Sequence, residues 1–411
     1  MEQFFKDSHT LQDKRQGPLG PYIDEFAGLL SEQSYSRQYA CRQLQLVAEL
    51  SHWLQQRKST VSDLTVAKME NFLRNRARPA RVRCGDAAGL KAFFELLLRK
   101  GQVTTSVNHV PKTAIDKLQD DFGLYLQQER VLAPTTVTNY ISFIKKFLTH
   151  HFKTGRVNLS DLSAADVVES MQHLALSLSR KRAKAMSSAL RSFLRYARYQ
   201  DFIRADLAAC VPCVADWSVA SIPKGLPTEH INRVLASCNR RSAIGRRDYA
   251  ILLLLARLGL RAGEVVCLTL EDIDWEAGCL TVRGKGNRNA ELPLPADVGK
   301  AITAYLRGGR LRSTNRSVFL RTKAPAVSLK GGRAVGAIVA KALARARINC
   351  RRKGAHQFRH TLATEMLRRG ASLTEIGEVL RHRNPQTTSI YAKVDLASLR
   401  TLALPWPGGS R

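Results

Sequence analysis

The stretch GAHQFRHTLATEMLRRG, Gly354 to Gly370, holds two histidines four residues apart, His356 and His360. The same spacing on a helix is the skeleton of a zinc-protease motif, in which a glutamate directly follows the first histidine and serves as the general base. Here Gln357 occupies that position, and a cation, Arg359, lies between the two histidines. This pattern removes the base and adds a charge that repels a metal ion, so the segment suits an anion better than a metal.

Helical spacing supports this anion-binding interpretation. His356 and Arg359 are three residues apart and therefore share one helix face. The planar guanidinium of arginine matches two oxygens of a phosphate group. His360 lies on the next turn, where burial alone is enough to explain it. The segment therefore predicts a phosphate site on a helix.

The charge of the whole chain indicates the same kind of partner. The 411 residues contain 65 Lys and Arg against 34 Asp and Glu, a formal net charge of +31. Such an excess favours a polyanion, with nucleic acid as the first candidate, because basic side chains neutralise phosphates and release counterions. An acidic membrane surface is the alternative, but the longest purely apolar run, Ala250 to Ala256, is too short to span a bilayer.

The first residues, MEQFFKDSHTLQDKRQG, have no apolar signal core, so we expect a cytoplasmic protein with reduced cysteines. Cys210 and Cys213 form one Cys-x-x-Cys pair, but no second pair follows at the spacing of a zinc finger. We interpret both as packing or linker residues. No metal and no other cofactor is expected.

An internal similarity predicts the domain organisation. DEFAGLL at residues 24–30 resembles DDFGLYL at 120–126, and LKAFFELLLRKG at 90–101 resembles LRSFLRYARYQD at 190–201. These matches favour a duplicated helical domain, with coincidence among leucine-rich helices as the alternative. The expected parts are an N-terminal helical domain at 1–108, a second helical domain at 112–210, a linker at 211–226, a further domain at 227–395 and a tail at 396–411.

Each helical domain carries a basic run, LRNRARPARVR in the first and SRKRAK in the second. A run of charge is often only a solvated face, but the net charge of the chain favours contact with a polyanion. The candidate nucleic-acid-binding residues are Arg74, Arg76, Arg78, Arg180, Lys181, Arg182 and Lys184.

The domain that starts near Pro227 is expected to be mostly helical with one small β-sheet. Thr228 is the expected cap of its first helix, Gly259 the left-handed end of the next, and Arg261 the start of a third. CLTVRGKGNRNAELPLP alternates apolar and polar residues around a turn at 284–289, which predicts a hairpin. The fold class is therefore mainly α, with two helical domains and one α+β domain.

Four segments of this last domain together resemble the tyrosine recombinase (phage integrase) family. They are LGLRAGEV at 258–265, VRGKGNRNAELPLP at 282–295, HQFRHTLATEML at 356–367 and LRHRNPQTTSIYAKV at 380–394. Their order and spacing are those of the family, and the second helical domain looks like its core-binding domain. Any one segment alone is a weak signal.

The resemblance assigns a role to particular residues. It implies that Tyr391 attacks a DNA phosphate and that Lys285 is the general acid. His356 would assist proton transfer or orient the phosphate, and Glu264 would hold the arginine and histidine in place. The donors to the phosphate oxygens would be Arg261, Arg359 and His382.

The chain departs from the family pattern at two positions. Phe358 stands where an aliphatic residue is commoner, and Arg381 stands where glycine is frequent. Arg381 is expected either to add a phosphate contact or to crowd the backbone. Neither change removes a catalytic group.

The resemblance implies a site-specific DNA recombinase that works without metal or ATP, through a 3′-phosphotyrosyl link and a Holliday junction. Integration, excision or transposition of a mobile element is the expected role. The implied partners are double-stranded DNA, further copies of the chain in a tetramer, and partner recombinases or DNA-bending proteins. The N-terminal domain would touch extra DNA or bridge protomers, and the tail would dock on a neighbouring protomer or pack on its own.

Two alternatives stay open at this level. A type IB topoisomerase shares the chemistry but relaxes DNA as a monomer. A non-catalytic DNA-binding protein would keep the fold without the reaction.

Overall fold

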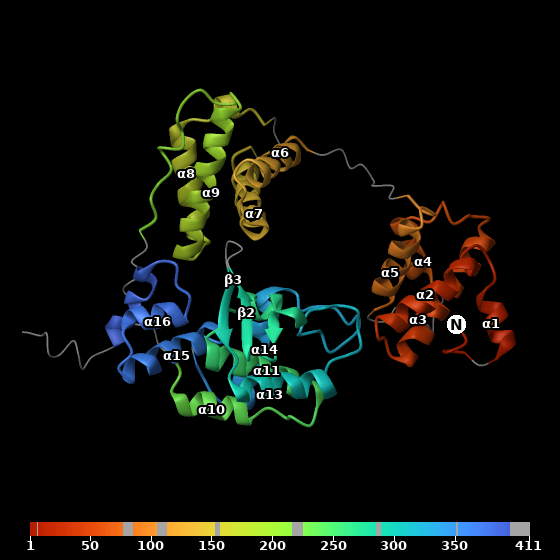
Figure 1. The fold of residues 1–411 in the computed structure, drawn as a ribbon. Coiled ribbons are helices and arrows are strands. Elements are labelled where there is room, and N and C mark those ends of the chain that lie inside the picture. Colours follow the sequence, from red (N-terminus) through yellow and green to blue (C-terminus); the bar gives the residue numbers. More distant parts are fainter. Residues whose placement is uncertain are drawn as a thin grey trace, which may run out of the picture. The chain divides into compact units, whose positions relative to one another are not determined.

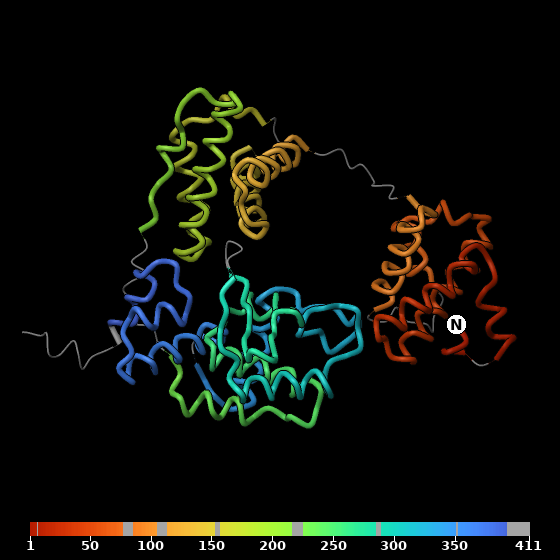
Figure 2. The backbone as a smooth tube through the Cα atoms, viewed as in Figure 1, coloured from red at the N-terminus to blue at the C-terminus, as the bar shows by residue number. Residues whose placement is uncertain are grey.

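The computed structural model describes residues 1–5, 7–76, 85–104, 113–152, 157–215, 225–284, 289–350 and 352–394. Only the backbone is described for residues 393 and 394. Figure 1 shows the helices and strands, and Figure 2 traces the backbone. The chain divides into two compact units. The first unit comprises Met1–Thr105 and Ser221–Arg411, and the second comprises Ser106–Ala220.

The N-terminal part of the first unit is helical. Its elements are α1 (Ser8–Lys14), α2 (Gly20–Glu32), α3 (Arg37–Gln56), α4 (Val66–Asn75) and α5 (Asp86–Arg99). Ser36 and Thr65 cap α3 and α4 by accepting backbone hydrogen bonds. Phe26 and Phe93 meet edge to face in its core, with ring centroids 5.1 Å apart.

The second unit is a helical domain with its own core. Its elements are α6 (Ala114–Gln128), α7 (Pro134–Phe152), the 3-10 helix η1 (Leu159–Asp161), α8 (Ala164–Leu176) and α9 (Arg180–Tyr199). Capping boxes begin α6 at Thr113 and α8 at Ser163. Phe122 and Phe193 pack in the core, with ring centroids 5.3 Å apart.

The part of the first unit that starts near Leu226 is called the C-terminal region below. Its helices are α10 (Thr228–Ala236), α11 (Ala243–Leu258), α12 (Ala262–Cys267), α13 (Ala296–Gly308), α14 (Gly331–Arg345), α15 (His356–Arg368) and α16 (Leu373–Val379). The 3-10 helices are η3 (Leu270–Asp272), η4 (Pro385–Thr387) and η5 (Ser389–Val394), and the strands are β1 (Ile273–Asp274), β2 (Cys279–Arg283) and β3 (Asn289–Pro293).

Helix α11 lies in the core of the C-terminal region. Its residues from Ala250 to Leu255 are all buried, which is the pattern of a helix covered on every side. It packs against α13 and α15, so the end of α11 and the start of α15 are held close together. The antiparallel sheet has the order β1-β2-β3, with Leu280 of β2 opposite Leu292 of β3.

The structure confirms the expected fold class, mainly helical with a small sheet. It confirms the hairpin and adds β1, a two-residue strand too short for a sequence pattern. Thr228 is not a cap as expected. It is the first residue of α10, and its hydroxyl donates to Glu365 of α15 instead of to the backbone of its own helix.

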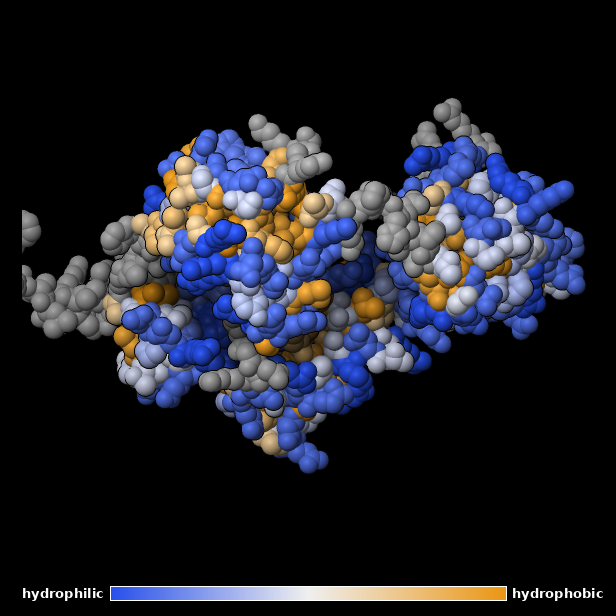
Figure 3. All heavy atoms as spheres, turned by 90° about the horizontal axis from the view of Figure 1, so that it is seen from above, coloured by the Kyte–Doolittle hydropathy of each residue, from blue (hydrophilic) through white to orange (hydrophobic). Residues whose placement is uncertain are grey.

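Helices among the described residues are all too short or too polar to cross a membrane. On the face drawn in Figure 3, hydrophilic side chains cover much of the surface.

The left-handed conformation and close packing at Gly259, which ends α11, can be tested by substitution. Its φ is +56°, and an added Cβ would lie 2.9 Å from Leu380 Cδ2 and 3.0 Å from Leu362 Cδ2. Gly259→Ala should therefore reduce the free energy of unfolding by about 1–2 kcal/mol. Gly263→Ala is the matched control, because it lies in α12 with open space around the added methyl group, and it should stabilise by about 0.5–1 kcal/mol.

Both effects are measured by urea unfolding of the two variants, with hydrogen exchange in peptides of the C-terminal region as the readout. Shifts of the same sign in the two variants would contradict this account of the α11 end.

Candidate active site

Arg261 is held at both its backbone and its side chain by Glu264. It precedes α12, and its backbone N–H donates to Glu264 Oε2 at 2.8 Å. Its guanidinium donates to Glu264 Oε1 at 2.6 Å. Burial raises the pKa of the Glu264 carboxyl, but the hydrogen bonds from Arg261 and the nearby arginine charges outweigh it and leave the pKa below its usual value. Glu264 is therefore ionised and fixes the direction of Arg261.

Arg359 lies on the first turn of α15 and is only 3% exposed. It donates to the carbonyl of Gly259 at 2.6 Å and to the carbonyl of Leu380. Because Gly259 ends α11, its carbonyl is free of a helical partner and can accept this bond. Burial, and then the charges of Arg261 and Arg381, lower the pKa of Arg359 to about 10, so the group is still charged at neutral pH.

Arg381 directly follows the C-cap of α16 and has a φ of +54°. This left-handed conformation at a helix end is the reason glycine is favoured there. The Arg381 guanidinium donates to Glu264 Oε2 at 3.0 Å, and its carbonyl accepts from Arg261 at 3.3 Å. The Arg381 side chain is therefore largely buried. It shares the Glu264 carboxylate with Arg261.

Among the described residues, three arginines and one glutamate lie close together and form what is called the arginine cluster below. The members are Arg261, Arg359, Arg381 and Glu264. Besides burial, the charges of Arg261 and Arg381 both lower the pKa of Arg359, because like charges nearby disfavour its charged form. An anion bound beside them would relieve this repulsion.

His382 and Thr388 stand beside the arginines. His382 Nδ1 and Thr388 Oγ1 are 2.8 Å apart. Burial, and then the charges of Arg359, Arg261 and Arg381, lower the pKa of His382 to about 4. His382 is therefore neutral at pH 7 and can form hydrogen bonds without carrying a charge.

Tyr391 of η5 lies in the same cluster and the same chain. It is 1% exposed, and its ring is parallel to that of His382 with centroids 6.5 Å apart. Its hydroxyl and His360 Nδ1 are 2.8 Å apart. Burial raises the pKa of the phenol, an effect that the charge of Arg359 partly offsets.

The structure thus gathers five residues singled out from the sequence, namely Arg261, Glu264, Arg359, His382 and Tyr391. His356 is exposed at the first position of α15, and its ring centroid is 6.1 Å from that of His360. Lys285 lies outside the described residues, between β2 and β3. The sequence analysis did not identify His360 as a partner of the phenol. Its position directly after Arg359 was a signal that it lies next to the arginines.

The basic residues of the N-terminal part differ in their surroundings. Arg74 is exposed and pairs with Glu70 at 3.5 Å. Arg76 is only 16% exposed and pairs with Glu49 at 2.6 Å and with Asp86 at 3.4 Å, an arrangement that favours a structural role. Arg78 lies outside the described residues.

The basic run of the second unit begins α9. All four of its candidate residues are exposed, namely Arg180, Lys181, Arg182 and Lys184. Arg182 extends over the ring of Phe143, 5.7 Å from its centroid. This end of α9 therefore presents several cations to solvent.

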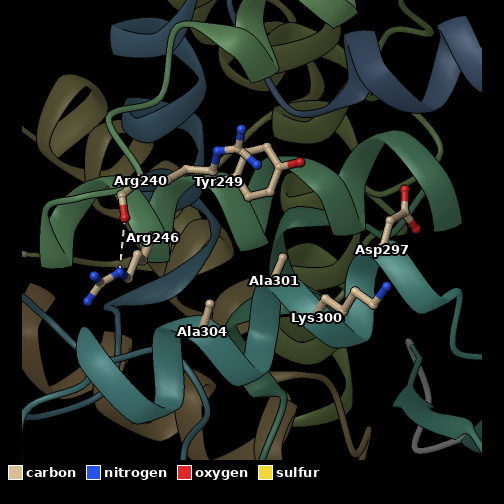
Figure 4. A pocket seen from close by; sticks show the side chains of 7 residues that line it. All are labelled: Arg240, Arg246, Tyr249, Asp297, Lys300, Ala301 and Ala304. Carbon is tan, nitrogen blue, oxygen red and sulfur yellow. Dashed lines mark hydrogen bonds between the residues drawn. The ribbon is translucent and has the colours of Figure 1, made fainter.

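The described residues contain no group of three His, Cys, Asp or Glu side chains placed to hold a metal ion. Cys210 and Cys213 are free thiols, and Cys213 Sγ accepts a hydrogen bond from Arg191. A cavity of about 260 Å³ lies between α11 and α13. Figure 4 shows the side chains that line it. None of the candidate catalytic residues lines it, and its Arg246 and Asp297 are engaged with Gly308 and Arg257.

The two histidines with lowered pKa values make stability depend on pH. His360 and His382 each have a pKa of about 4 in the folded protein, against 6.5 in the unfolded chain. Between these values the unfolded chain binds more protons, so the free energy of unfolding should fall as the pH falls from 6.5 to 4. Arg381→Gly removes one charge that lowers the pKa of His382, so the fall should be shallower in this variant.

Urea unfolding at a series of pH values, read out by hydrogen exchange in α15 peptides, measures the slopes. Arg383→Ala removes an equal charge from an exposed neighbour and should keep the slope of the unsubstituted protein. Equal slopes for all three proteins would contradict the coupling between Arg381 and His382.

Comparison with known families agrees with this geometry. The model of the phage integrase family matches residues 224–397. The model of the phage integrase N-terminal SAM-like domain matches residues 120–201, within the second unit.

Individual proteins are similar over most of the chain. An integrase/recombinase of Sinorhizobium fredii, y4rA, is 45% identical over 410 residues, which cover 99% of this chain and 99% of that protein. The XerH site-specific recombinase in a post-cleavage complex with its difH substrate has a TM-score of 0.56 at 18% identity, over 81% of this chain and 92% of that one. A lambda integrase from a tetramer bound to a Holliday junction has a TM-score of 0.52 at 15% identity, over 77% and 87%.

Because the two solved structures share less than 20% identity with this chain, they support the fold alone. The sequence of y4rA, in contrast, is similar to this chain over its whole length. With the two matched domain models, these similarities show that the chain belongs to the tyrosine recombinase (phage integrase) family.

Proposed function

We propose that this protein is a site-specific DNA recombinase, which cleaves and rejoins double-stranded DNA through a covalent phosphotyrosyl intermediate. The observation that supports it most directly is the position of Tyr391, whose phenol lies in the same cluster as Arg359 and His382. A nucleophile beside a concentration of fixed cations is what transfer of a phosphoryl group requires.

The arginine cluster would bind the scissile phosphate and stabilise the transition state. A pentavalent phosphorus carries developing negative charge on its oxygens, and donors that are already in place stabilise that charge with little reorganisation. Arg261 is fixed by Glu264, and Arg359 by the carbonyls of Gly259 and Leu380. His382, neutral at pH 7, would add a hydrogen bond to a phosphate oxygen.

In the proposed reaction the Tyr391 oxygen attacks phosphorus, and the bond from phosphorus to the 5′-oxygen breaks. The products are a 3′-phosphotyrosyl link and a free 5′-hydroxyl. Lys285, between β2 and β3, would give its proton to the leaving oxygen, and His356 at the exposed start of α15 would orient the phosphate. The covalent bond retains the energy of the phosphodiester until a second hydroxyl attacks, so no metal or ATP is required.

DNA binding outside the active site would depend on the basic surface. The net charge of +31 and the exposed cations at the start of α9 favour contact with phosphates. We extend the proposal to a homotetramer that exchanges strands between two sites through a Holliday junction, since a tetramer of lambda integrase, which shares the fold, is bound to such a junction.

The cellular role that we propose is integration, excision or transposition of a mobile element, in the cytoplasm where its DNA substrate lies. In this proposal the region at 1–108 is a duplicated helical domain that contacts further DNA or bridges protomers, and the tail at 396–411, which lies outside the described residues, docks on a neighbour. Partner recombinases or DNA-bending proteins would join where the site requires them.

A nicked suicide DNA that traps the cleaved end tests the chemistry. The unsubstituted protein should form a covalent adduct with such DNA, and Tyr391→Phe should lower adduct formation by at least about 1000-fold because it removes the nucleophile. Tyr249→Phe is the matched control, since Tyr249 lines the cavity of Figure 4, which none of the candidate catalytic residues lines, and it should react normally.

Gel electrophoresis under denaturing conditions detects the adduct. Equal adduct formation by Tyr391→Phe would refute the assignment of the nucleophile. DNA binding without any adduct in the unsubstituted protein would indicate a DNA-binding protein that has the fold without the reaction.

Strand exchange between two sites distinguishes a recombinase from a topoisomerase. A plasmid that carries two copies of the target site, taken from the DNA that flanks this gene, should be resolved into two circles. The same plasmid with one site should not yield recombinant circles. Rapid relaxation of supercoils on any plasmid, without recombinant products, would favour topoisomerase activity instead.

A further inference from the structure

The phenol of Tyr391 has a hydrogen-bond partner to which the sequence assigned no role. Resting on the proposed function, we propose that His360 accepts the phenolic proton of Tyr391 as the tyrosine oxygen attacks the DNA phosphate. The role is catalytic in the strict sense, because His360 touches the reacting oxygen itself.

The first argument is geometric. His360 Nδ1 and Tyr391 Oη are 2.8 Å apart, and the two rings meet edge to face with centroids separated by 5.7 Å. This distance is within the range that a general base needs for the proton it removes. His356, which the sequence favoured for proton transfer, is exposed at the start of α15.

The second argument is the position of His360 on α15. It directly follows Arg359, so one turn of helix carries both a cation for the phosphate and an acceptor for the nucleophile. Helix α15 packs against η5, which carries Tyr391. A phosphate bound at Arg359 would therefore lie close to a phenol that is already hydrogen-bonded to its acceptor.

The protonation state of His360 fits this role. Burial, and then the nearby His356, Arg352 and Arg359, lower its pKa to about 4, so the ring is neutral at pH 7 and offers a lone pair. The other ionisable groups that face it are Tyr391 on η5 and His382 beyond α16. The negative charge of a bound phosphate opposes the effect of Arg359, so His360 becomes a stronger base when DNA is present.

The step balances without any additional reagent. The Tyr391 oxygen forms a bond to phosphorus, and its proton moves to His360 Nδ1. The bond from phosphorus to the 5′-oxygen breaks, and this oxygen takes a proton from the general acid, for which Lys285 is the proposed group. During rejoining the 5′-hydroxyl attacks phosphorus and gives its proton back to Lys285, the bond from phosphorus to the Tyr391 oxygen breaks, and the imidazolium of His360 returns its proton to the departing phenol.

Two substitutions separate proton transfer from mere positioning. In His360→Asn, the side-chain amide can reach the position of Nδ1 and hydrogen-bond the phenol, but it cannot take up a proton. In His360→Ala, both functions are lost and space opens for a small base. Adduct formation on nicked suicide DNA under single-turnover conditions should fall by about 100-fold or more in both variants.

Added imidazole provides the second measurement. It should raise the cleavage rate of His360→Ala at least several-fold and leave His360→Asn almost unchanged, because only the alanine variant leaves room for it. His9→Asn is the control, since His9 is an exposed residue of helix α1, and this variant should cleave normally. Melting temperature and DNA affinity, measured for each variant, show whether the folded protein still binds its substrate.

Three results would overturn the inference. Cleavage by His360→Asn at nearly the normal rate would show that His360 only positions the phenol. Normal cleavage by both His360 variants would assign the proton to another group. The same would follow if imidazole restored cleavage in His356→Ala but not in His360→Ala. In each case the unsubstituted protein still forms the Tyr391 adduct, whereas absence of that adduct would refute the proposed function itself.

Discussion

The carboxylate of Glu264 is the interaction on which the candidate active site depends. It is 6% exposed and accepts hydrogen bonds from Arg261 and Arg381, two cations that would otherwise repel each other and Arg359. A buried carboxylate paired in this way orients both guanidinium groups, while the excess of positive charge remains available to an anion. The cluster therefore has an excess of positive charge that a bound anion would neutralise, which is the property expected of a phosphate site.

The backbone around this carboxylate is built from helix ends. Gly259 ends α11, Arg261 precedes α12, Arg359 stands on the first turn of α15, and Arg381 follows α16. Carbonyl groups at helix ends have no partner within their own helix, and here two of them receive the hydrogen bonds of Arg359. The burial of α11 holds these ends together, so the same packing that stabilises the core also places the cations.

Much of this organisation could be predicted from the sequence because it has local causes. The left-handed Gly259, the hairpin that follows Cys279 and the helix that begins at His356 each follow from nearby residues. Thr228 shows the limit, because a contact with Glu365, far away in the chain, decides what its hydroxyl does. The same limit applies to Arg76, whose carboxylate partners Glu49 and Asp86 come from other helices.

By itself, the sequence determined that the protein is basic, mainly helical and equipped with an arginine, histidine and tyrosine pattern typical of one family. Only the tertiary structure decided that Arg381 shares Glu264 with Arg261 and that the phenol of Tyr391 meets His360. The physical reason is that both pairs join separate elements of the C-terminal region. A hydrogen bond between them depends on how buried helices pack, and no spacing along the chain encodes that distance.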